Sequence, residues 1–197
     1  LGSGGPNMST VIPSGFTAKL INPTIDAGLV PTFALGDRVW FDENANGNQD
    51  PGEGAVSGAT VELLDVTNRP AVNASGQTVE AVTTDPFGRY VFDNLLPGRY
   101  HVKFGGLPVG NSFTVAKASS SPVTEDSDAN VDTGIAVVDL NADSPDVSAV
   151  VDTDNVSIAT RINRTIDAGV TVPSFSIGNR VWNDLTNDGV VGIAEPG

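Results

Sequence analysis

Cysteine is absent from the 197-residue chain, and histidine occurs once, as His101. Without cysteine there is neither a disulfide framework nor thiol chemistry. The chain also lacks the G-x-S-x-G pattern of serine hydrolases and the H-E-x-x-H pattern of zinc proteases. His101 falls on the outward face of an expected strand, away from any group that would activate it. We therefore expect a protein that is not an enzyme.

Basic residues are few, with 10 lysines and arginines against 24 acidic residues and a net charge of −14. This balance argues against nucleic acid and anionic membrane surfaces as partners. No apolar run is long enough to insert into a membrane. No signal peptide is visible, and the Leu1–Gly5 start is unlike a native one, so we expect a cut-out or a mature fragment. A small exported module without disulfides needs another source of stability, and a bound metal ion would provide it.

An acidic, Asn/Gly-rich stretch, D-E-N-A-N-G-N-Q-D-P-G-E, has the spacing of a twelve-residue calcium loop. Gly47 stands at position 6, where the loop turns sharply. Every available ligand is an oxygen, which suits a hard cation such as Ca²⁺ and not zinc. The alternative is a solvated turn, because Asn, Asp and Gly crowd turns without any metal. The predicted ligands are Asp42, Asn44, Asn46, Asn48 through its carbonyl, Asp50 and Glu53.

A second stretch with the same spacing, D-L-T-N-D-G-V-V-G-I-A-E, favours calcium over a chance turn. Gly192 stands at its ninth position, which would leave a water molecule to complete the coordination. The predicted ligands of this loop are Asp184, Thr186, Asp188, Val190 through its carbonyl, and Glu195.

Two motifs recur along the chain and reveal a repeat. N-P-T-I-D-A-G at 22–28 returns as N-R-T-I-D-A-G at 163–169, an offset of 163 − 22 = 141. F-A-L-G-D-R-V-W at 33–40 returns as F-S-I-G-N-R-V-W at 175–182, an offset of 175 − 33 = 142. We therefore expect a tandem repeat: residues 1–30 as the tail, or closing strand, of a preceding module, 31–170 as a complete module, and 171–197 as the head of a following module.

The complete module has the pattern of an all-β protein. Short segments rich in β-branched and aromatic residues alternate with Gly, Pro and Asp turns, and no capped segment of helical period occurs. In 99–104 the apolar residues alternate with charged ones, as in a strand with one buried face. This pattern predicts a two-sheet sandwich. The expected strands are 35–41, 59–66, 78–84, 89–92, 99–104, 131–140 and 147–151, with a long last strand in 155–167.

Aromatic residues are assigned mostly to the core. Trp40 and Trp182 end apolar strands, so we interpret them as core anchors beside the loops and not as sugar-recognition residues. Four further aromatics on strands are expected inside the sandwich, namely Tyr90, Phe92, Tyr100 and Phe104.

The chain resembles the B-type (SdrD B-like) repeats of Gram-positive serine-aspartate repeat adhesins, which are related to Cna B-type domains. The matching segments are L-G-D-R-V-W-F-D-E-N-A-N-G-N-Q-D (35–50), V-S-G-A-T-V-E-L (56–63), T-D-P-F-G-R-Y-V-F (84–92), L-L-P-G-R-Y-H-V-K-F (95–104), D-S-D (126–128) and T-I-D-A-G (165–169). The resemblance implies a Greek-key sandwich, bound calcium, and a rod-like spacer on a cell surface. It also places a calcium site near Asp126 and Asp128.

The roles of the other acidic residues each have two alternatives. Asp126, Asp128 and Asp132 form either a second ion site or a solvated acidic loop, and Asp152 and Asp154 either join a further site or lie on a plain surface loop. Some Cna-type relatives carry an internal Lys–Asn isopeptide bond. Neither Lys19, Lys103 nor Lys117 lies on the strand where such a lysine is usual, so none is expected here.

Three functions compete. The chain is a calcium-stiffened spacer module of a long extracellular surface protein, a filament subunit assembled by strand exchange between partial modules, or a ligand-binding adhesin module. The first is favoured, because the repeat and the paired loops support it together. The expected partners are neighbouring modules of the same chain or of identical chains, with a host or matrix ligand as a further partner.

Overall fold

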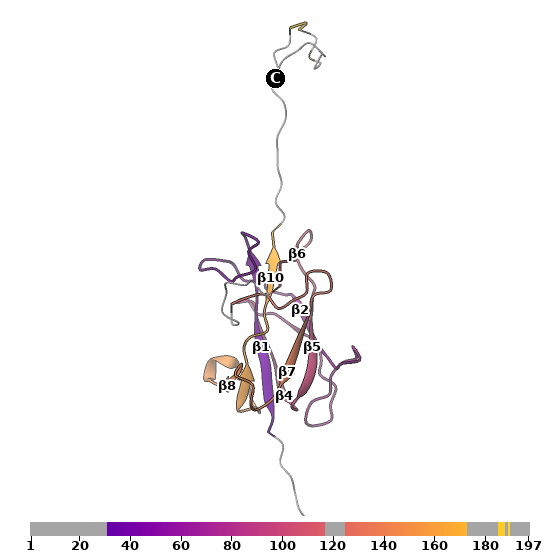
Figure 1. Ribbon diagram of the computed structural model, residues 1–197, viewed down its shortest axis with the longest axis vertical. Helices are drawn as coiled ribbons and strands as arrows, with labels where there is room; N and C mark the ends of the chain where they lie inside the picture. The colour runs from indigo at the N-terminus through magenta and orange to yellow at the C-terminus, as the bar shows by residue number, and fades with distance from the viewer. Residues whose placement is uncertain (1–30, 117–124, 173–184, 188, 190–197) are drawn as a thin grey trace, which may run out of the picture.

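The computed structural model describes residues 31–116, 125–172, 185–187 and 189, and within the first two ranges it forms a β-sandwich (Figure 1). The two sheets face each other and enclose the apolar core. The strands are β1 (Phe33–Asp42), β2 (Thr60–Leu64), β3 (Val82–Thr83), β4 (Arg89–Leu95), β5 (Gly98–Gly105), β6 (Ser112–Phe113), β7 (Ile135–Leu140), β8 (Val147–Ala149), β9 (Arg161–Asn163) and β10 (Ala168–Thr171), with one 3-10 turn, η1 (Asp152–Asp154).

Strand β1 is the centre of the first sheet, whose order is β6-β10-β1-β9-β8 with β4 also paired to β1. Its first half pairs antiparallel with β4 and parallel with β9, and its second half pairs parallel with β10. The second sheet has the order β3-β2-β5-β7. The chain crosses between the sheets repeatedly, so the predicted all-β Greek-key sandwich is confirmed.

Burial follows the predicted alternation. In β5, Tyr100, Val102 and Phe104 point into the core, whereas Arg99 and Lys103 face outward. Those two outward residues form ion pairs with Asp139 and Glu62 on the neighbouring strands, each at 2.7 Å. The predicted core aromatics are all buried, and Trp40 is completely inaccessible to solvent. Trp40 is therefore a core anchor, as expected; Trp182 lies outside the described residues.

The predicted long last strand is wrong. Of 155–167 only 161–163 is a strand, β9, and the next strand, β10, begins beyond the expected range at Ala168, because backbone groups of the residues between them bind partners outside β1. The Thr165 amide donates to the Asn163 side chain at 2.8 Å, and the Asp167 amide donates to Asp128 at 3.1 Å. The Tyr90 hydroxyl donates to the Ile166 carbonyl at 2.6 Å. Side chains thus compete successfully with the sheet for backbone partners.

Two other expected strands are shorter than predicted. Of 78–84 only β3 remains, and 131–140 begins as a turn closed by the Asn130 side chain, which accepts the amides of Asp132 and Thr133. Polar side chains at these positions hold turns that β propensity alone does not reveal.

The described chain starts and ends at opposite ends of the sandwich. Phe33 begins β1, and Thr171, at the end of β10, pairs with Asp42 at the other end of β1 (Figure 1). Ten residues of strand separate the two ends, or roughly 30 Å at about 3.3 Å per residue. No helix in the described part of the chain is long and apolar enough to span a membrane.

Candidate metal centre

The first predicted calcium loop begins at the last residue of β1. Asp42 is fully buried, and its carboxylate organises the turn. One oxygen accepts the Asn46 amide at 3.1 Å, and the other accepts the Gly47 amide at 2.8 Å and the Thr114 hydroxyl at 2.5 Å. Because the Thr114 amide also donates to the Gly169 carbonyl at 3.0 Å, this contact joins the loop to β10.

The second half of the loop is closed by Glu53. Its two carboxylate oxygens accept the amides of Glu43 at 3.0 Å and Asp50 at 2.8 Å. The side-chain amides of Asn44 and Asn46 both donate to one oxygen of Asp50 at 2.8 Å. These side chains therefore belong to one closed loop that is rich in oxygen atoms.

The first half of this loop has residues with positive φ at its fourth and sixth positions, Ala45 (φ 57°) and Gly47 (φ 79°). The second predicted loop has the same feature at the same two positions, Asn187 (φ 54°) and Gly189 (φ 75°). The described parts of the two loops therefore share their turn conformation. Of the ligands predicted there, Thr186 is described and exposed, whereas Asp184, Asp188, Val190 and Glu195 lie outside the described residues.

Two observations bear on whether a cation fits the first loop. The Asn48 side-chain oxygen is buried without a hydrogen-bond partner, which is costly unless something else satisfies it. Oxygen atoms are the ligands that Ca²⁺ prefers. Nevertheless, the described residues contain no group of three acidic, His or Cys side chains arranged to hold a metal. The donor chemistry fits calcium, and the side-chain geometry here is held by hydrogen bonds within the loop.

The acidic D-S-D segment lies directly against this loop. Asn48 forms a β-bridge with Asp126, the Gln49 amide donates to the Glu125 carbonyl at 2.7 Å, and the Ser127 amide donates to the Gly47 carbonyl at 3.0 Å. Sequence reasoning treated the two stretches separately, because 73 residues separate their first candidate ligands in the sequence (Asp126 and Asp42 are 126 − 42 = 84 apart, and Asp126 and Glu53 are 126 − 53 = 73 apart). The structure makes them neighbours.

The side chains of Asp126 and Asp128 line a cavity of about 440 Å³ next to the loop. Asp139, Asp143 and Asp146 line the same cavity. Asp132 does not join them, because it lies in the exposed turn that begins at Asn130. The cavity is strongly acidic and therefore attracts cations.

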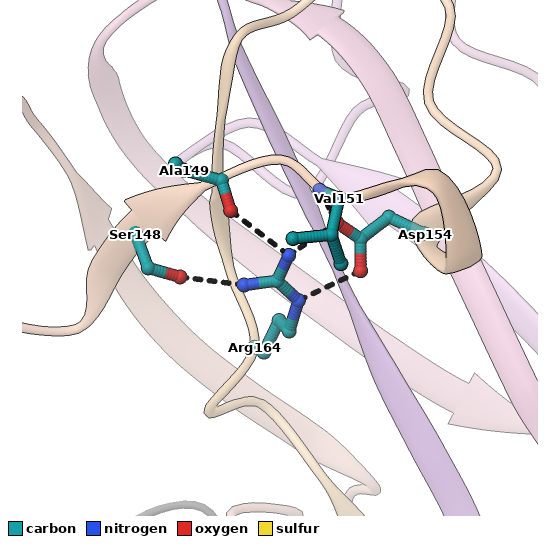
Figure 2. Close-up of polar contacts among 5 residues, drawn as sticks. All are labelled: Ser148, Ala149, Val151, Asp154 and Arg164. Atoms are coloured by element: carbon teal, nitrogen blue, oxygen red, sulfur yellow. Dashed lines mark hydrogen bonds and ion pairs between the residues drawn. The ribbon is translucent and has the colours of Figure 1, made fainter.

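Asp154, which the sequence offered as a further ion ligand, is instead the partner of Arg164 (Figure 2). Arg164 donates to Asp154 through Nε at 2.8 Å and again through Nη2, and it also binds the Ser148 hydroxyl at 2.5 Å and the Ala149 carbonyl at 3.1 Å. The Arg164 hydrogen bond holds the pKa of Asp154 below its usual value. Sequence analysis missed this clamp, because ten residues separate the partners and no regular element links them.

A second arrangement that sequence analysis missed is a buried pair of carboxyl groups. Asp167 is fully buried, and its Oδ1 accepts the Arg38 amide at 3.1 Å. Burial raises the pKa of Asp37 to about 7, and burial beside Asp37 raises the pKa of Asp167 as well. Both residues lie in the recurring motifs, G-D-R-V-W and T-I-D-A-G. That recurrence was the available signal, although it was used only to define the repeat.

The chain is similar in sequence to known proteins of one family. The SdrD B-like domain family matches residues 33–170. The chain is 33% identical over 85% of its length to serine-aspartate repeat-containing protein F of Staphylococcus epidermidis, covering 9% of that protein. It is 34% identical over 89% of its length to serine-aspartate repeat-containing protein D of Staphylococcus aureus, covering 11% of that protein.

Among solved structures, the minor pilin GBS52 of Streptococcus agalactiae aligns over 77% of this chain and 49% of its own, with a TM-score of 0.40 and 13% identity. The chain spans only about a tenth of the length of the two serine-aspartate repeat proteins named above. The family match covers the whole sandwich, from the first residue of β1 into β10. The chain therefore belongs to the SdrD B-like domain family.

Proposed function

We propose that this chain is a calcium-stiffened structural module, a non-catalytic spacer within a long protein of the extracellular cell surface. The observation that carries the proposal is the position of the first loop. It lies at the end of the sandwich where β10 leaves, roughly 30 Å from the start of β1. A module whose chain passes from one end to the other adds length to a rod, and family membership favours the same role.

Calcium would bind the oxygens of the first loop, supplied by the side chains of Asp42, Asn44, Asn46, Asp50 and Glu53 and by the backbone carbonyl of Asn48. A divalent cation would offset the repulsion between the loop carboxylates in a protein of net charge −14. It would also fix the amide orientations, which hydrogen bonds to Asp50 hold at present. Asp126 and Asp128 are proposed as an additional cation-attracting site, because they line the acidic cavity beside the loop.

Thermal unfolding with and without a chelator tests the proposal. A site with a dissociation constant of about 10⁻⁴ M contributes roughly 1.4 kcal/mol at 1 mM calcium. In a module of this size, that corresponds to an increase in Tm of roughly 3–6 °C per occupied site. Isothermal titration with calcium on the same sample gives the number of ions.

Glu53→Gln and Glu43→Gln are a matched pair of variants for this test. Both remove one negative charge from the same loop, but only Glu53 is a predicted ligand, and the Glu43 side chain is exposed. We expect Glu53→Gln to lose most of the calcium-dependent Tm shift and Glu43→Gln to keep it. An unchanged Tm on chelation of the parent protein, together with no titration heat, would refute calcium stiffening while leaving the family assignment intact.

The two other functions remain predictions. Assembly by strand exchange depends on residues 1–30, which lie outside the described residues. A dilute sample that stays monomeric would count against it. Recognition of a host or matrix ligand would be tested on an array of cationic and glycan ligands.

A further inference from the structure

Two arginines face each other across the outer surface of the first sheet. Arg38 of β1 and Arg89 of β4 are direct partners in the antiparallel register. Like charges in this position destabilise a sheet. Within the described part of the chain, neither guanidinium has a hydrogen bond or ion pair to a carboxylate, and the Arg38 Nε is buried without a partner. The pair therefore has unused capacity to bind an anion.

These two arginines line a cavity of about 330 Å³, which we name the arginine cavity. Arg164 lines it as well, and the segment that carries η1 forms one wall. The carboxylates in the lining are Asp37 and Asp154, and Asp154 is already bound to Arg164 (Figure 2). The lining contains three guanidinium groups and two carboxylates, so its formal net charge is 3 − 2 = +1. The net charge of the whole protein is −14.

The chemistry of the arginine cavity suits a carboxylate. A guanidinium group offers planar, paired N–H donors that match the two oxygens of a carboxylate. The remaining lining residues are uncharged: Gly36, Gln49, Tyr90, Val91, Val151, Thr153 and Ile162. A carboxylate there would also relieve the repulsion between Arg38 and Arg89.

The same protein carries a loop of matching chemistry. Residues 141–146 join β7 to β8 at the surface and contain Asp143 and Asp146; we name them the acidic loop. The Asp143 amide donates to the Asn141 side chain at 3.0 Å, and the Val147 amide donates to the Ser144 carbonyl at 3.2 Å. The loop is therefore a short, preorganised turn, which lowers the entropy lost when it docks.

We propose that the acidic loop of one copy of this chain docks into the arginine cavity of another copy. The two surfaces differ, so the contact is heterologous, and each docked copy still offers one free acidic loop or one free arginine cavity to a further copy. Charge complementarity sets the partner and the register of such a contact. The arginine cavity includes no predicted calcium ligand of the first loop, whereas Asp143 and Asp146 of the acidic loop line the acidic cavity together with Asp126 and Asp128, so the test is made at one fixed calcium concentration.

Sedimentation analysis over a range of protein concentrations, in constant calcium and moderate salt, tests the proposal. Arg38→Gln/Arg89→Gln changes the net charge from −14 to −14 − 2 = −16 and removes the cavity cations. Arg69→Glu gives the same net charge of −16 at an exposed position outside the cavity. We expect the parent and Arg69→Glu to associate alike, and Arg38→Gln/Arg89→Gln to associate about tenfold more weakly or not at all.

Mixing complementary variants gives the decisive result. Asp143→Asn/Asp146→Asn has an intact cavity, and Arg38→Gln/Arg89→Gln has an intact acidic loop. Each alone is expected to stay monomeric, and their mixture is expected to form dimers and nothing larger, because every further contact surface is disabled. Thermal melts confirm that each variant folds, and we expect the arginine variant to be at least as stable as the parent. A parent that stays monomeric at every concentration, or an arginine variant that associates like Arg69→Glu, would overturn the inference.

Discussion

At the scale of single residues, Gly169 shows how closely the loop end of the sandwich is packed. A Cβ atom at this position would lie 2.5 Å from Cγ2 of Thr114 and 2.9 Å from Cζ2 of Trp40. Gly169 pairs with Trp40 in the β1–β10 register, so neither neighbour can withdraw freely. Gly169→Ala is therefore expected to lower the free energy of unfolding by about 2 kcal/mol, measured by chemical denaturation.

Gly105→Ala is the control for that substitution, because a Cβ there meets nothing within 4 Å. Gly105 ends β5, and we expect its replacement to leave stability unchanged or slightly improved. Equal effects of the two substitutions would mean that the packing around Trp40 is looser than described.

Asp93 makes stability depend on pH through backbone hydrogen bonds. Its carboxylate accepts the amides of Ser157, Ile158 and Ala159 at 2.7, 2.8 and 2.9 Å. Burial raises the pKa of Asp93, but the backbone hydrogen bonds outweigh this and lower it overall. A lowered folded-state pKa stabilises the protein above the unfolded value, near pH 4, and this contribution is lost as pH falls through the folded value.

Asp93→Asn is accordingly expected to cost about 1–2 kcal/mol at pH 7. The difference from the parent should shrink as the pH is lowered below about 4, since the parent then loses its charge. Urea denaturation from pH 7 to pH 3 measures the difference, with the exposed Glu80→Gln as control. A difference that does not depend on pH would show that the carboxylate charge has no part in holding this segment.

At the scale of elements, residues 150–160 join β8 to β9, and we call this segment the excursion. It has little regular structure, and its stability depends on Arg164. Ala159 of this segment packs in a small apolar cluster with Ala34 and Ile162. Arg164 binds Asp154 (Figure 2). The Asp154 side chain is only 9% exposed, so removing its partner leaves a nearly buried charge unpaired. Arg164→Gln is expected to destabilise this excursion by about 2 kcal/mol and to speed amide exchange in 150–159.

Arg161→Gln is the matched control, because Arg161 lies in β9 of the same segment but outside the clamp. Exchange should rise in the excursion and stay unchanged in β2 and β5 of the other sheet. A uniform rise over both sheets would mean that Arg164 supports the whole fold and not one element.

The elements also show why part of the fold was predictable. Strand β5 was predicted to within one residue at each end, because burial of one face dictates its alternating pattern, and the apolar strand expected over 35–41 lies within β1. The interruption between β9 and β10 was not predictable, since its cause is a set of long-range hydrogen bonds from Asp128, Tyr90 and Arg164. Likewise the loop was found through its local spacing, whereas its contact with Asp126 depends on the tertiary fold.

At the scale of the whole molecule, the first loop is connected to the strand by which the chain leaves the sandwich. The Thr114 hydroxyl binds Asp42, the Thr114 amide binds Gly169, and the Ser127 hydroxyl accepts the Gly169 amide at 3.1 Å. Both segments that contact the loop thus also contact β10. A cation that orders the loop would therefore also order β10, the last strand of the sandwich.

Hydrogen exchange in calcium and in chelator measures this connection. We expect calcium to slow exchange in the loop and, with it, in β6 and β10, because Thr114, which follows β6, binds both Asp42 and Gly169, and Ser127 binds both Gly47 and Gly169. Strands β2 and β3 lie in the other sheet and should change little. Thr114→Val removes the hydroxyl bound to Asp42 while keeping the backbone, and it should weaken the calcium effect on β10 without abolishing it, because Ser127 still links Gly47 to Gly169. If β10 responds equally in Thr114→Val and in the parent protein, the Thr114 hydroxyl does not transmit the effect of calcium from the loop to β10.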